Sequence, residues 1–266
     1  MKKRRVGMIM CCVLFLTALV CAGCGKSASK DKLTEIKEKG VLTVGTSADN
    51  EPWEYIDEND NFAGYDIELI TEIAERMGVK AEITDMSFDA LIAAVQNGKV
   101  DVAIASIGAS EERKQAVDFT KTYHKEMNNV YVVRKDSGIQ FTDKDEITGY
   151  KVGMQSGSLP DNYITSLIEE GKMDEKNVSR YESDEAVILD LAAGRIEVAA
   201  GDITTVEKFL EQYDIEVALR MAFYDLGENI AVQKNEDELT KELDNIIDEM
   251  YEDGYLEKLG EKWGIE

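Results

Sequence analysis

The residues best suited to chemistry lie between positions 103 and 120, where an apolar run gives way to small residues and then to an arginine. Ser106 offers a hydroxyl, Gly108 and Ser110 let a ligand approach backbone N–H groups, and Arg113 adds a planar fork of donors. Such a set would bind an anion, and the fork matches a carboxylate. A solvated loop with a surface arginine would have the same local sequence, so the rest of the chain must discriminate between the two.

The composition limits the classes of partner and cofactor that the protein can have. With 266 residues, of which 44% are hydrophobic, the chain can bury a core and form one or two domains. A formal net charge of -24 argues against nucleic acid or an anionic membrane surface as a partner, because phosphate binding needs clustered Lys and Arg. His124 is the single histidine, and no Cys or His cluster has the spacing of metal ligands, so neither a metal nor a cofactor is expected.

The N-terminus has the features of an export signal. Four basic residues at positions 2–5 precede an apolar run at positions 6–20, which is short for a membrane span and typical of a secretory signal peptide, here residues 1–23. The run Cys21-Ala-Gly-Cys24 resembles the processing motif of bacterial lipoproteins, although Cys21 stands where Leu is usual. Cys24 would carry the lipid and residues 24–32 would form a polar tether, whereas an uncleaved anchor is the alternative.

Two copies of one pattern run through the remaining chain. Residues 41–47 and 150–156 are short β-rich runs that end in small residues. Residues 91–106 and 188–202 both have a helical pattern, a glycine stop and a strand, which ends at Ser106 in the first copy and at Asp202 in the second. The sequence therefore predicts an α/β fold with two lobes, each a mainly parallel sheet flanked by helices.

The repeat also predicts where a ligand would bind. Ligands of open α/β sheets sit beyond the carboxyl ends of the strands, where Ser47, Ser106, Ser156 and Asp202 fall. Two such edges facing one another form a cleft, with an arginine clamp on one lobe and a carboxylate on the other, which suits the zwitterion of an α-amino acid. We expect residues 33–125 plus 227–266 to form lobe 1 and residues 126–226 to form lobe 2, with bending near residues 124–127 and 222–228 as the lobes close.

Several motifs carry a resemblance to a known family. They are Val44-Gly-Thr-Ser, Pro52-Trp-Glu-Tyr, Gly64-Tyr-Asp-Ile-Glu-Leu, Phe88-Asp-Ala-Leu, Glu112-Arg113, Val117-Asp-Phe-Thr and Lys262-Trp-Gly. Together they make residues 33–266 similar to the bacterial extracellular solute-binding proteins that serve ABC importers of polar amino acids. The fold implied is the two-lobe periplasmic-binding-protein fold, with the ligand in a cleft between the lobes.

The resemblance implies a set of ligand contacts. Arg113 would hold the ligand α-carboxylate with the Ser106 hydroxyl and the Gly108 amide, Ser158 would close on the same carboxylate, and Asp202 would hold the α-ammonium group. Many family members have Ser or Thr where this chain has Gly108, so its clamp has one hydroxyl fewer. Asp202 could equally be a helix N-cap, and both roles can coexist.

The side-chain pocket departs further from the family pattern. Phe88 matches an aromatic pocket residue, and Asn50 replaces a stacking Tyr or Phe. Trp53 is the ninth candidate ligand residue, although the core is its more expected place. No second Arg or Lys falls at a pocket position, so an acidic ligand side chain would be buried without a cation. We therefore predict a neutral polar or cationic L-amino acid, with Asn50 and Gln155 as hydrogen-bonding partners.

The resemblance implies an extracytoplasmic binding component that delivers its ligand to the permease of an ABC transporter. We expect a non-enzymatic monomer on the outer face of the cell membrane, or in the periplasm, that touches the membrane only through the lipid on Cys24. An enzyme on the same fold, similar to cyclohexadienyl dehydratase, is one alternative, and a ligand sensor module is another.

Overall fold

The computed structural model describes residues 31–125, 129–221 and 226–265. The predicted signal peptide, Cys24 and most of the tether lie outside these residues, as do parts of both expected bending segments. Within the described chain, no helix combines the length and the apolar character that crossing a membrane requires.

The first sheet contains five strands, of which four run in one direction. Its order is β5 (Lys80–Asp85), β1 (Val41–Thr46), β6 (Val102–Ala103), β13 (Ala231–Val232) and β7 (Asp118–Phe119). Strand β1 pairs in parallel with β5 and β6, whereas β13 is antiparallel to both of its neighbours. We call this sheet and the elements packed on it lobe 1.

The second sheet repeats the arrangement of the first. Its order is β10 (Val178–Tyr181), β9 (Val152–Gln155), β11 (Val198–Asp202), β8 (Asn129–Arg134) and β12 (Ile215–Met221), with β8 as the reversed strand. Strands β1 and β9, and likewise β6 and β11, occupy equivalent places, which confirms the internal repeat seen in the sequence. We call this sheet and its helices lobe 2; the boundary residues of the two lobes stay a prediction.

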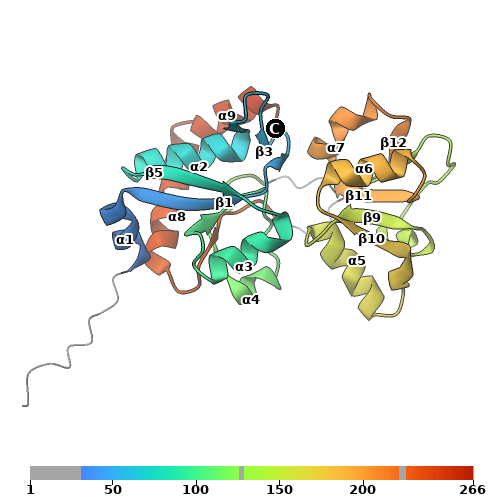
Figure 1. Cartoon of the computed structure of the whole chain (residues 1–266), viewed down its shortest axis with the longest axis horizontal. Coiled ribbons are helices and arrows are strands. Elements are labelled where there is room, and N and C mark those ends of the chain that lie inside the picture. Colours follow the sequence, from blue (N-terminus) through green and yellow to red (C-terminus); the bar gives the residue numbers. More distant parts are fainter. Residues whose placement is uncertain (1–30, 126–128, 222–225, 266) are drawn as a thin grey trace, which may run out of the picture. The chain divides into compact units, whose positions relative to one another are not determined.

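Helices cover both faces of the lobe 1 sheet because its strands are apolar on both sides. Leu42, Val44 and Val102 are buried with α1 (Lys32–Lys39), α2 (Tyr65–Arg76), α8 (Asp237–Glu252) and α9 (Tyr255–Trp263). The other face, which includes Ala103 and Ala231, packs on η1 (Phe88–Ala90), α3 (Leu91–Gln96) and α4 (Arg113–Ala116). Figure 1 shows α8 and α9 beside the elements of lobe 1, so the end of the chain returns to that lobe, as predicted.

Lobe 2 is layered in the same way (Figure 1). Its sheet packs on α5 (Leu159–Glu169) and η2 (Lys144–Gly149) through one apolar cluster, and on α6 (Asp184–Ala192) and α7 (Ile203–Leu210) through another. The short η3 (Glu175–Asn177) precedes β10. Gly98 and Gly194 follow α3 and α6 with φ of 66° and 70°, a left-handed conformation that glycine adopts without strain. These are the two glycine stops that the sequence predicts.

A small antiparallel sheet lies between β1 and α2 along the chain. It is formed by β2 (Asp49–Asn50), β3 (Glu54–Ile56) and β4 (Phe62–Ala63). Trp53 is only 2% exposed and belongs to the lobe 1 core, where its ring packs edge-on against Tyr65. The expectation that Trp53 is a core residue is therefore confirmed.

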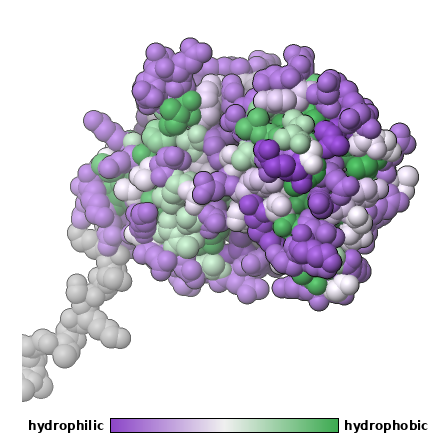
Figure 2. Space-filling view, turned by 45° about the vertical axis from the view of Figure 1, so that its right-hand side comes forward, coloured by the Kyte–Doolittle hydropathy of each residue, from purple (hydrophilic) through white to green (hydrophobic). Residues whose placement is uncertain are grey.

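The surface is largely hydrophilic. In Figure 2, hydrophilic residues cover most of the visible face and hydrophobic residues appear in smaller groups between them. Three large hydrophobic side chains are exposed among the described residues, namely Ile56, Leu189 and Tyr251. With 54 acidic and 30 basic residues, the chain presents an acidic surface that water solvates well.

Candidate functional site

A cavity of about 60 Å³ brings together residues from both lobes. It lies at the carboxyl ends of the strands, where the repeat predicts the ligand site. Seven of the nine sequence-predicted ligand residues line it: Asn50, Phe88, Ser106, Arg113, Gln155, Ser158 and Asp202. Its other lining residues are Ala105, Asn129, Leu159, Pro160, Asp184, Gly201 and Thr205.

Arg113 opens the short helix α4 and is only 7% exposed, so it is not the surface arginine of a solvated loop. Its Nη1 donates to the carbonyl oxygen of Gly108 at 2.8 Å, and its Nη2 donates to that of Gly157 in lobe 2 at 2.7 Å. The ring of Phe88 lies 5.3 Å from Cζ, a cation–π distance. The guanidinium is therefore held in a fixed orientation by groups from both lobes.

Ser106 lies just past β6 in the left-handed region, with φ of 48°. Its backbone N–H donates to Asp66 Oδ2 at 2.7 Å, and its Oγ lies 2.8 Å from Glu228 Oε1. A non-glycine residue with this φ needs support from its surroundings, and these two carboxyl groups supply it. Gly108 does not line the cavity; it forms an isolated bridge with Glu228 and accepts from Arg113.

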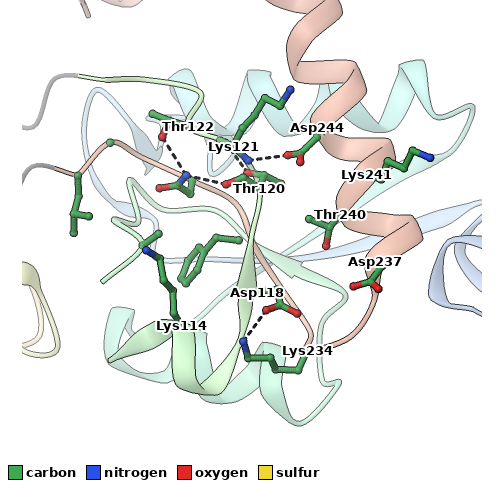
Figure 3. Close-up of a pocket in the computed structure, with 15 residues that line it drawn as sticks. Lys114, Asp118, Thr120, Lys121, Thr122, Lys234, Asp237, Thr240, Lys241 and Asp244 are labelled. Atoms are coloured by element: carbon green, nitrogen blue, oxygen red, sulfur yellow. Dashed lines mark hydrogen bonds and ion pairs between the residues drawn. The ribbon is translucent and has the colours of Figure 1, made fainter. Parts of the chain in front are cut away.

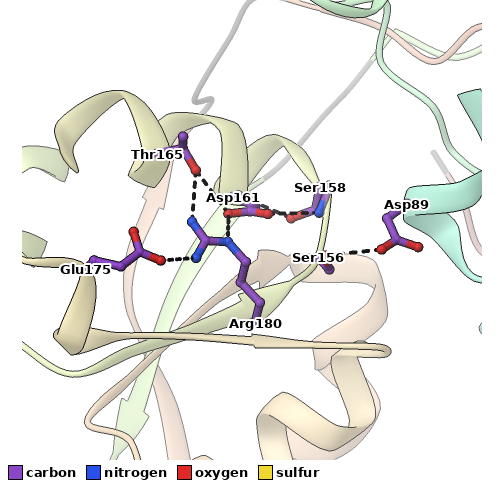
Figure 4. A network of polar contacts seen from close by, with 8 residues as sticks. Asp89, Ser156, Ser158, Asp161, Thr165, Glu175 and Arg180 are labelled. Atoms are coloured by element: carbon purple, nitrogen blue, oxygen red, sulfur yellow. Dashed lines mark hydrogen bonds and ion pairs between the residues drawn. The ribbon is translucent and has the colours of Figure 1, made fainter. Parts of the chain in front are cut away.

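The lobe 2 loop at residues 155–158 is held by its own network (Figure 4). Ser158 caps α5, since its Oγ accepts from the N–H of Asp161, and Asp161 Oδ2 accepts from the N–H of Gly157 at 2.9 Å. Arg180 pairs with Asp161 at 2.7 Å and thereby fixes that carboxylate. The backbone of residues 155–158 is therefore held in a fixed geometry where Gln155 and Ser158 line the cavity.

Asp202 caps a helix and also lines the cavity, so the two roles that the sequence left open remain compatible. Asp202 is the N-cap of α7, where its Oδ1 accepts from the N–H of Thr204 at 2.9 Å. The same residue lines the cavity. A carboxylate has four lone-pair positions, so capping leaves capacity for a ligand ammonium group.

Asp184 is a residue that sequence reasoning missed. It is the first residue of α6, capped by Ser183, and it lines the cavity from lobe 2. Burial, with the Asp49 and Asp202 carboxylates nearby, raises the pKa of Asp184 to about 7. The sequence signal was weak because an acidic residue in the first turn of a helix is common for reasons of helix stability alone.

Two predicted pocket residues already have protein partners. Asn50 Oδ1 accepts from the Thr205 hydroxyl across the lobes, and Gln155 Nε2 donates to the carbonyl oxygen of Glu182 at 3.2 Å. Trp53 does not line the cavity, and its indole N–H donates to Thr204 Oγ1 at 2.8 Å. The Asn50 side-chain amide also lies close to the Glu54 carboxyl group, whereas Gln155 keeps its carbonyl oxygen as an acceptor.

A larger cavity of about 780 Å³ is lined by lobe 1 residues together with Leu226, which belongs to one of the expected bending segments (Figure 3). Its charged side chains are mostly paired: Lys121 with Asp248, Lys234 with Asp118, and Lys114 with Glu111. It contains none of the predicted ligand residues, so size alone does not make it the better candidate. Among the described residues, no group of three or more Asp, Glu, His or Cys side chains could hold a metal ion.

The comparisons with known proteins agree with this geometry. Residues 42–266 match the family model described as "Bacterial extracellular solute-binding proteins, family 3". The chain is 33% identical over 267 residues to the arginine-binding extracellular protein ArtP of Bacillus subtilis, an alignment that covers 99% of this chain and 98% of that protein. It is 26% identical to the L-cystine-binding protein TcyJ of Escherichia coli over 99% of this chain and 97% of the relative.

Solved structures are similar over most of their length. A mutant of ArgBP from T. maritima matches with a TM-score of 0.76 and 34% identity, covering 88% of this chain and 99% of that one. An ancestral arginine-binding protein bound to arginine matches with a TM-score of 0.76 and 32% identity, covering 84% and 98%. Because the family model covers nearly the whole described chain and the two-lobe α/β fold is shared, this protein belongs to the bacterial extracellular solute-binding proteins of family 3.

Proposed function

We propose that the protein captures a cationic L-amino acid of the arginine type between its lobes and delivers it to the permease of an ABC importer. The observation that carries this proposal is the charge pattern of one cavity, where Arg113 stands with two carboxylates, Asp184 and Asp202. Arg113 with Ser106 and Ser158 would bind the α-carboxylate, the Gly108 carbonyl oxygen would orient Arg113, and Asp202 would bind the α-ammonium group.

The carboxyl group of Asp184 favours a ligand whose side chain carries a second positive charge. No lysine, arginine or histidine of the described chain forms an ion pair with it, and its carboxyl group is buried enough to raise its pKa. A neutral ligand side chain would leave this carboxyl group without a counter-charge, whereas a guanidinium or ammonium group would stabilise its charged form. Phe88 would pack on the aliphatic part of the ligand, and Asn50 and Gln155 would complete its hydrogen bonds.

The names of the similar proteins also favour arginine as the ligand, and they indicate which other amino acids compete with it. Two of the similar proteins are named for arginine and others for cystine or histidine. The ancestral arginine-binding protein has also been solved bound to glutamine, so a neutral polar amino acid is the main competitor. Another structural neighbour is described as a precursor of cyclohexadienyl dehydratase, which makes an enzyme on this fold the alternative from another class.

Isothermal titration calorimetry of the chain without its first 23 residues tests the proposal. Arginine, lysine, histidine, glutamine, cystine and glutamate are titrated in turn. We expect arginine to bind most tightly and glutamate not to bind. Tighter binding of glutamine or glutamate than of every cationic ligand would contradict the proposed ligand class. Recovery of the ligand unchanged after long incubation separates binding from the dehydratase alternative.

We propose further that the protein is exported, anchored by a lipid on Cys24, and monomeric. Support comes from the sequence before the tether and from the extracellular family. A diacylglyceryl thioether holds a protein at a membrane more firmly than a single acyl chain. Cys24→Ser should therefore move the protein from the membrane fraction to the medium or periplasm, while Cys12→Ser serves as the control. Unchanged membrane association of Cys24→Ser would contradict lipid anchoring.

A further inference from the structure

Three buried carboxyl groups of lobe 1 lie close to one another beside Ser106. Glu54 lies on β3, Asp66 in the first turn of α2, and Glu228 just before β13. Their exposed fractions are 1%, 0% and 1%. We call them the carboxyl cluster. Asp66 and Glu228 are the two groups that contact Ser106 directly.

The hydrogen bonds of the carboxyl cluster leave four oxygen atoms unsatisfied. Asp66 Oδ2 accepts from the Ser106 N–H at 2.7 Å and from the Tyr123 hydroxyl at 3.0 Å, and Glu228 Oε1 contacts Ser106 Oγ at 2.8 Å. Asp66 Oδ1, Glu228 Oε2 and both oxygens of Glu54 have no partner in the described structure. None of the three carboxyl groups forms an ion pair with a described residue.

Ionising all three carboxyl groups at once would cost much free energy, because they are buried and adjacent. Burial raises the pKa of Glu228, and the Asp66 carboxylate raises it further. The other titratable groups that face the cluster are neutral or acidic side chains and one histidine: Tyr65, Tyr123, Asp49, Asp202 and His124. His124 pairs with Glu228 through its backbone, and its ring packs on Trp53. A bound metal would be another way to lower the cost, but the described acidic residues offer no suitable group.

Asp66 is better equipped than Glu228 to stay charged. It accepts two hydrogen bonds and lies in the first turn of the twelve-residue helix α2, where the helix dipole favours a negative charge. Glu228 has a single side-chain contact, the one to Ser106 Oγ. Protons held by the cluster are therefore expected on Glu228 and on Glu54, because a proton on Glu54 would give one of its unpaired oxygens a hydrogen to share with the nearby Asp66 carboxylate.

The 2.8 Å contact between Glu228 and Ser106 can carry its hydrogen in two ways. An ionised Glu228 accepts the Ser106 hydroxyl hydrogen, which is then directed at Glu228 Oε1 and is not available to a ligand. A protonated Glu228 instead donates to Ser106 Oγ, and the Ser106 hydroxyl hydrogen is free to turn toward the cavity that Ser106 lines. Only the second arrangement lets the Ser106 hydroxyl donate to an anion there.

We propose that Glu228 is a positioning residue that retains a proton and donates it in a hydrogen bond to Ser106, so that the Ser106 hydroxyl can donate to the ligand carboxylate. The inference rests on the proposed function for its ligand, and it adds that affinity is coupled to the protonation of a residue that never touches the ligand. When Glu228 loses its proton, the ligand loses one donor and meets an additional buried negative charge nearby.

The test compares wild type with Glu228→Gln, whose side-chain amide donates to Ser106 Oγ at every pH. Arginine affinity is measured by calorimetry from about pH 6 to about pH 9, a range in which an ordinary Glu stays ionised. We expect wild type to weaken about tenfold over this range relative to Glu228→Gln, which corresponds to about 1.4 kcal/mol. Titration of the ligand amine and of Asp184 affects both proteins alike, so the difference belongs to Glu228.

Glu82→Gln is the matched control, because Glu82 is an exposed residue of β5 in the same lobe. It should follow the wild-type pH profile. A second measurement needs no variant: wild type titrated in buffers of different ionisation enthalpy should take up protons on binding where Glu228 is partly ionised. A wild-type affinity that stays below that of Glu228→Gln by the same factor at every pH would show that Glu228 is ionised throughout, and would overturn the proposal.

A third measurement needs no ligand and so separates this inference from the proposed function. Infrared spectra of the ligand-free protein should show a carbonyl band from protonated carboxyl groups at neutral pH, part of which is lost in Glu228→Gln. If that band is the same in both proteins, Glu228 holds no proton and the inference fails, whichever ligand the protein binds.

Discussion

At the scale of single residues, Arg113 is both a ligand-binding candidate and a contact between lobes. Its hydrogen bonds to the carbonyl oxygens of Gly108 and Gly157 show that its guanidinium has structural partners, which the sequence did not indicate. An ammonium group cannot form this planar set of bonds. Orientation of the guanidinium therefore depends on the protein as well as on the ligand.

Arg113→Lys should bind arginine at least about tenfold more weakly, because one charge-assisted hydrogen bond contributes about 1.5 to 3 kcal/mol. Calorimetry measures the change. Arg76→Lys, which alters a surface pair with Glu72 on α2, is the control and should bind as wild type does. Arginine binding by Arg113→Lys with the wild-type dissociation constant would show that Arg113 does not hold the carboxylate.

Asp184 should make the ligand-free protein less stable as the pH rises. Its folded-state pKa of about 7 lies above the ordinary value, so the folded state binds more protons than the unfolded state between about pH 4 and pH 7. The free energy of unfolding then falls across that window and levels off above it. Asp184→Asn removes the effect and should be more stable than wild type at about pH 8, by a few kcal/mol at most, since one pKa unit corresponds to about 1.4 kcal/mol.

Urea unfolding of Asp184→Asn at about pH 4 and about pH 8 measures this stability difference, which should appear mainly at the higher pH. Glu185→Gln, the exposed neighbour on α6, should show no such pH-dependent gain. The same Asp184→Asn protein should lose affinity for arginine but not for glutamine. Equal losses of affinity for arginine and glutamine would mean that Asp184 does not distinguish ligands by the charge of their side chains.

At the scale of elements, the start of α5 depends on a pair that lies behind the ligand loop. Asp161 is buried, accepts from the Gly157 N–H and pairs with Arg180, which also bonds Glu175 and Thr165 (Figure 4). The carbonyl oxygen of Gly157 in turn accepts from Arg113. A substitution of Asp161 would therefore alter the position of Arg113 through the backbone of Gly157.

Asp161→Ala should weaken arginine binding by about fivefold to a hundredfold, because it leaves the Gly157 N–H without its acceptor, a loss of about 1 to 3 kcal/mol. Glu175→Ala removes a more exposed partner of Arg180 and should change binding little. Calorimetry on the two variants compares them. Equal affinities for Asp161→Ala and wild type would mean that the loop keeps its geometry without this support.

At the scale of the whole molecule, the described contacts between the lobes explain why the cavity is small. Trp53 donates to Thr204, Asn50 accepts from Thr205, and Lys208 pairs with Glu51 at 3.1 Å. The volume of about 60 Å³ is below the range of about 300 to 1,000 Å³ that is typical of ligand pockets. A ligand can enter only if these contacts separate, and it can satisfy Arg113 and Asp202 together only when the lobes approach again.

We expect the ligand-free protein to open in solution, so small-angle scattering should show a smaller radius of gyration with saturating arginine than without ligand. Glutamate, which we expect not to bind, is the control and should leave the radius unchanged. The expected cause is closure about the two segments that cross between lobes. An identical radius with and without arginine would contradict closure.

The sequence by itself determined the local features of this protein. Alternating apolar runs, the glycine stops at Gly98 and Gly194, and the cap at Asp202 depend on neighbours within a few residues, so their meaning can be read along the chain. The repeat then predicted two equivalent sheets, and strand ends indicated where Ser106, Arg113 and Ser158 would gather. These expectations hold because a parallel sheet places the carboxyl ends of its strands at one edge.

Only the tertiary structure decided which acidic residues matter. Glu228 meets Ser106 across 122 positions, and Asp66 meets it across 40. Asp184 looks like any acidic residue at a helix start until α6 places it on the cavity. The chain has 54 acidic residues, and their types and spacing alone do not separate solvated carboxylates from buried ones. Burial and neighbouring charge set the chemistry of a carboxyl group, and both arise only when distant segments pack together.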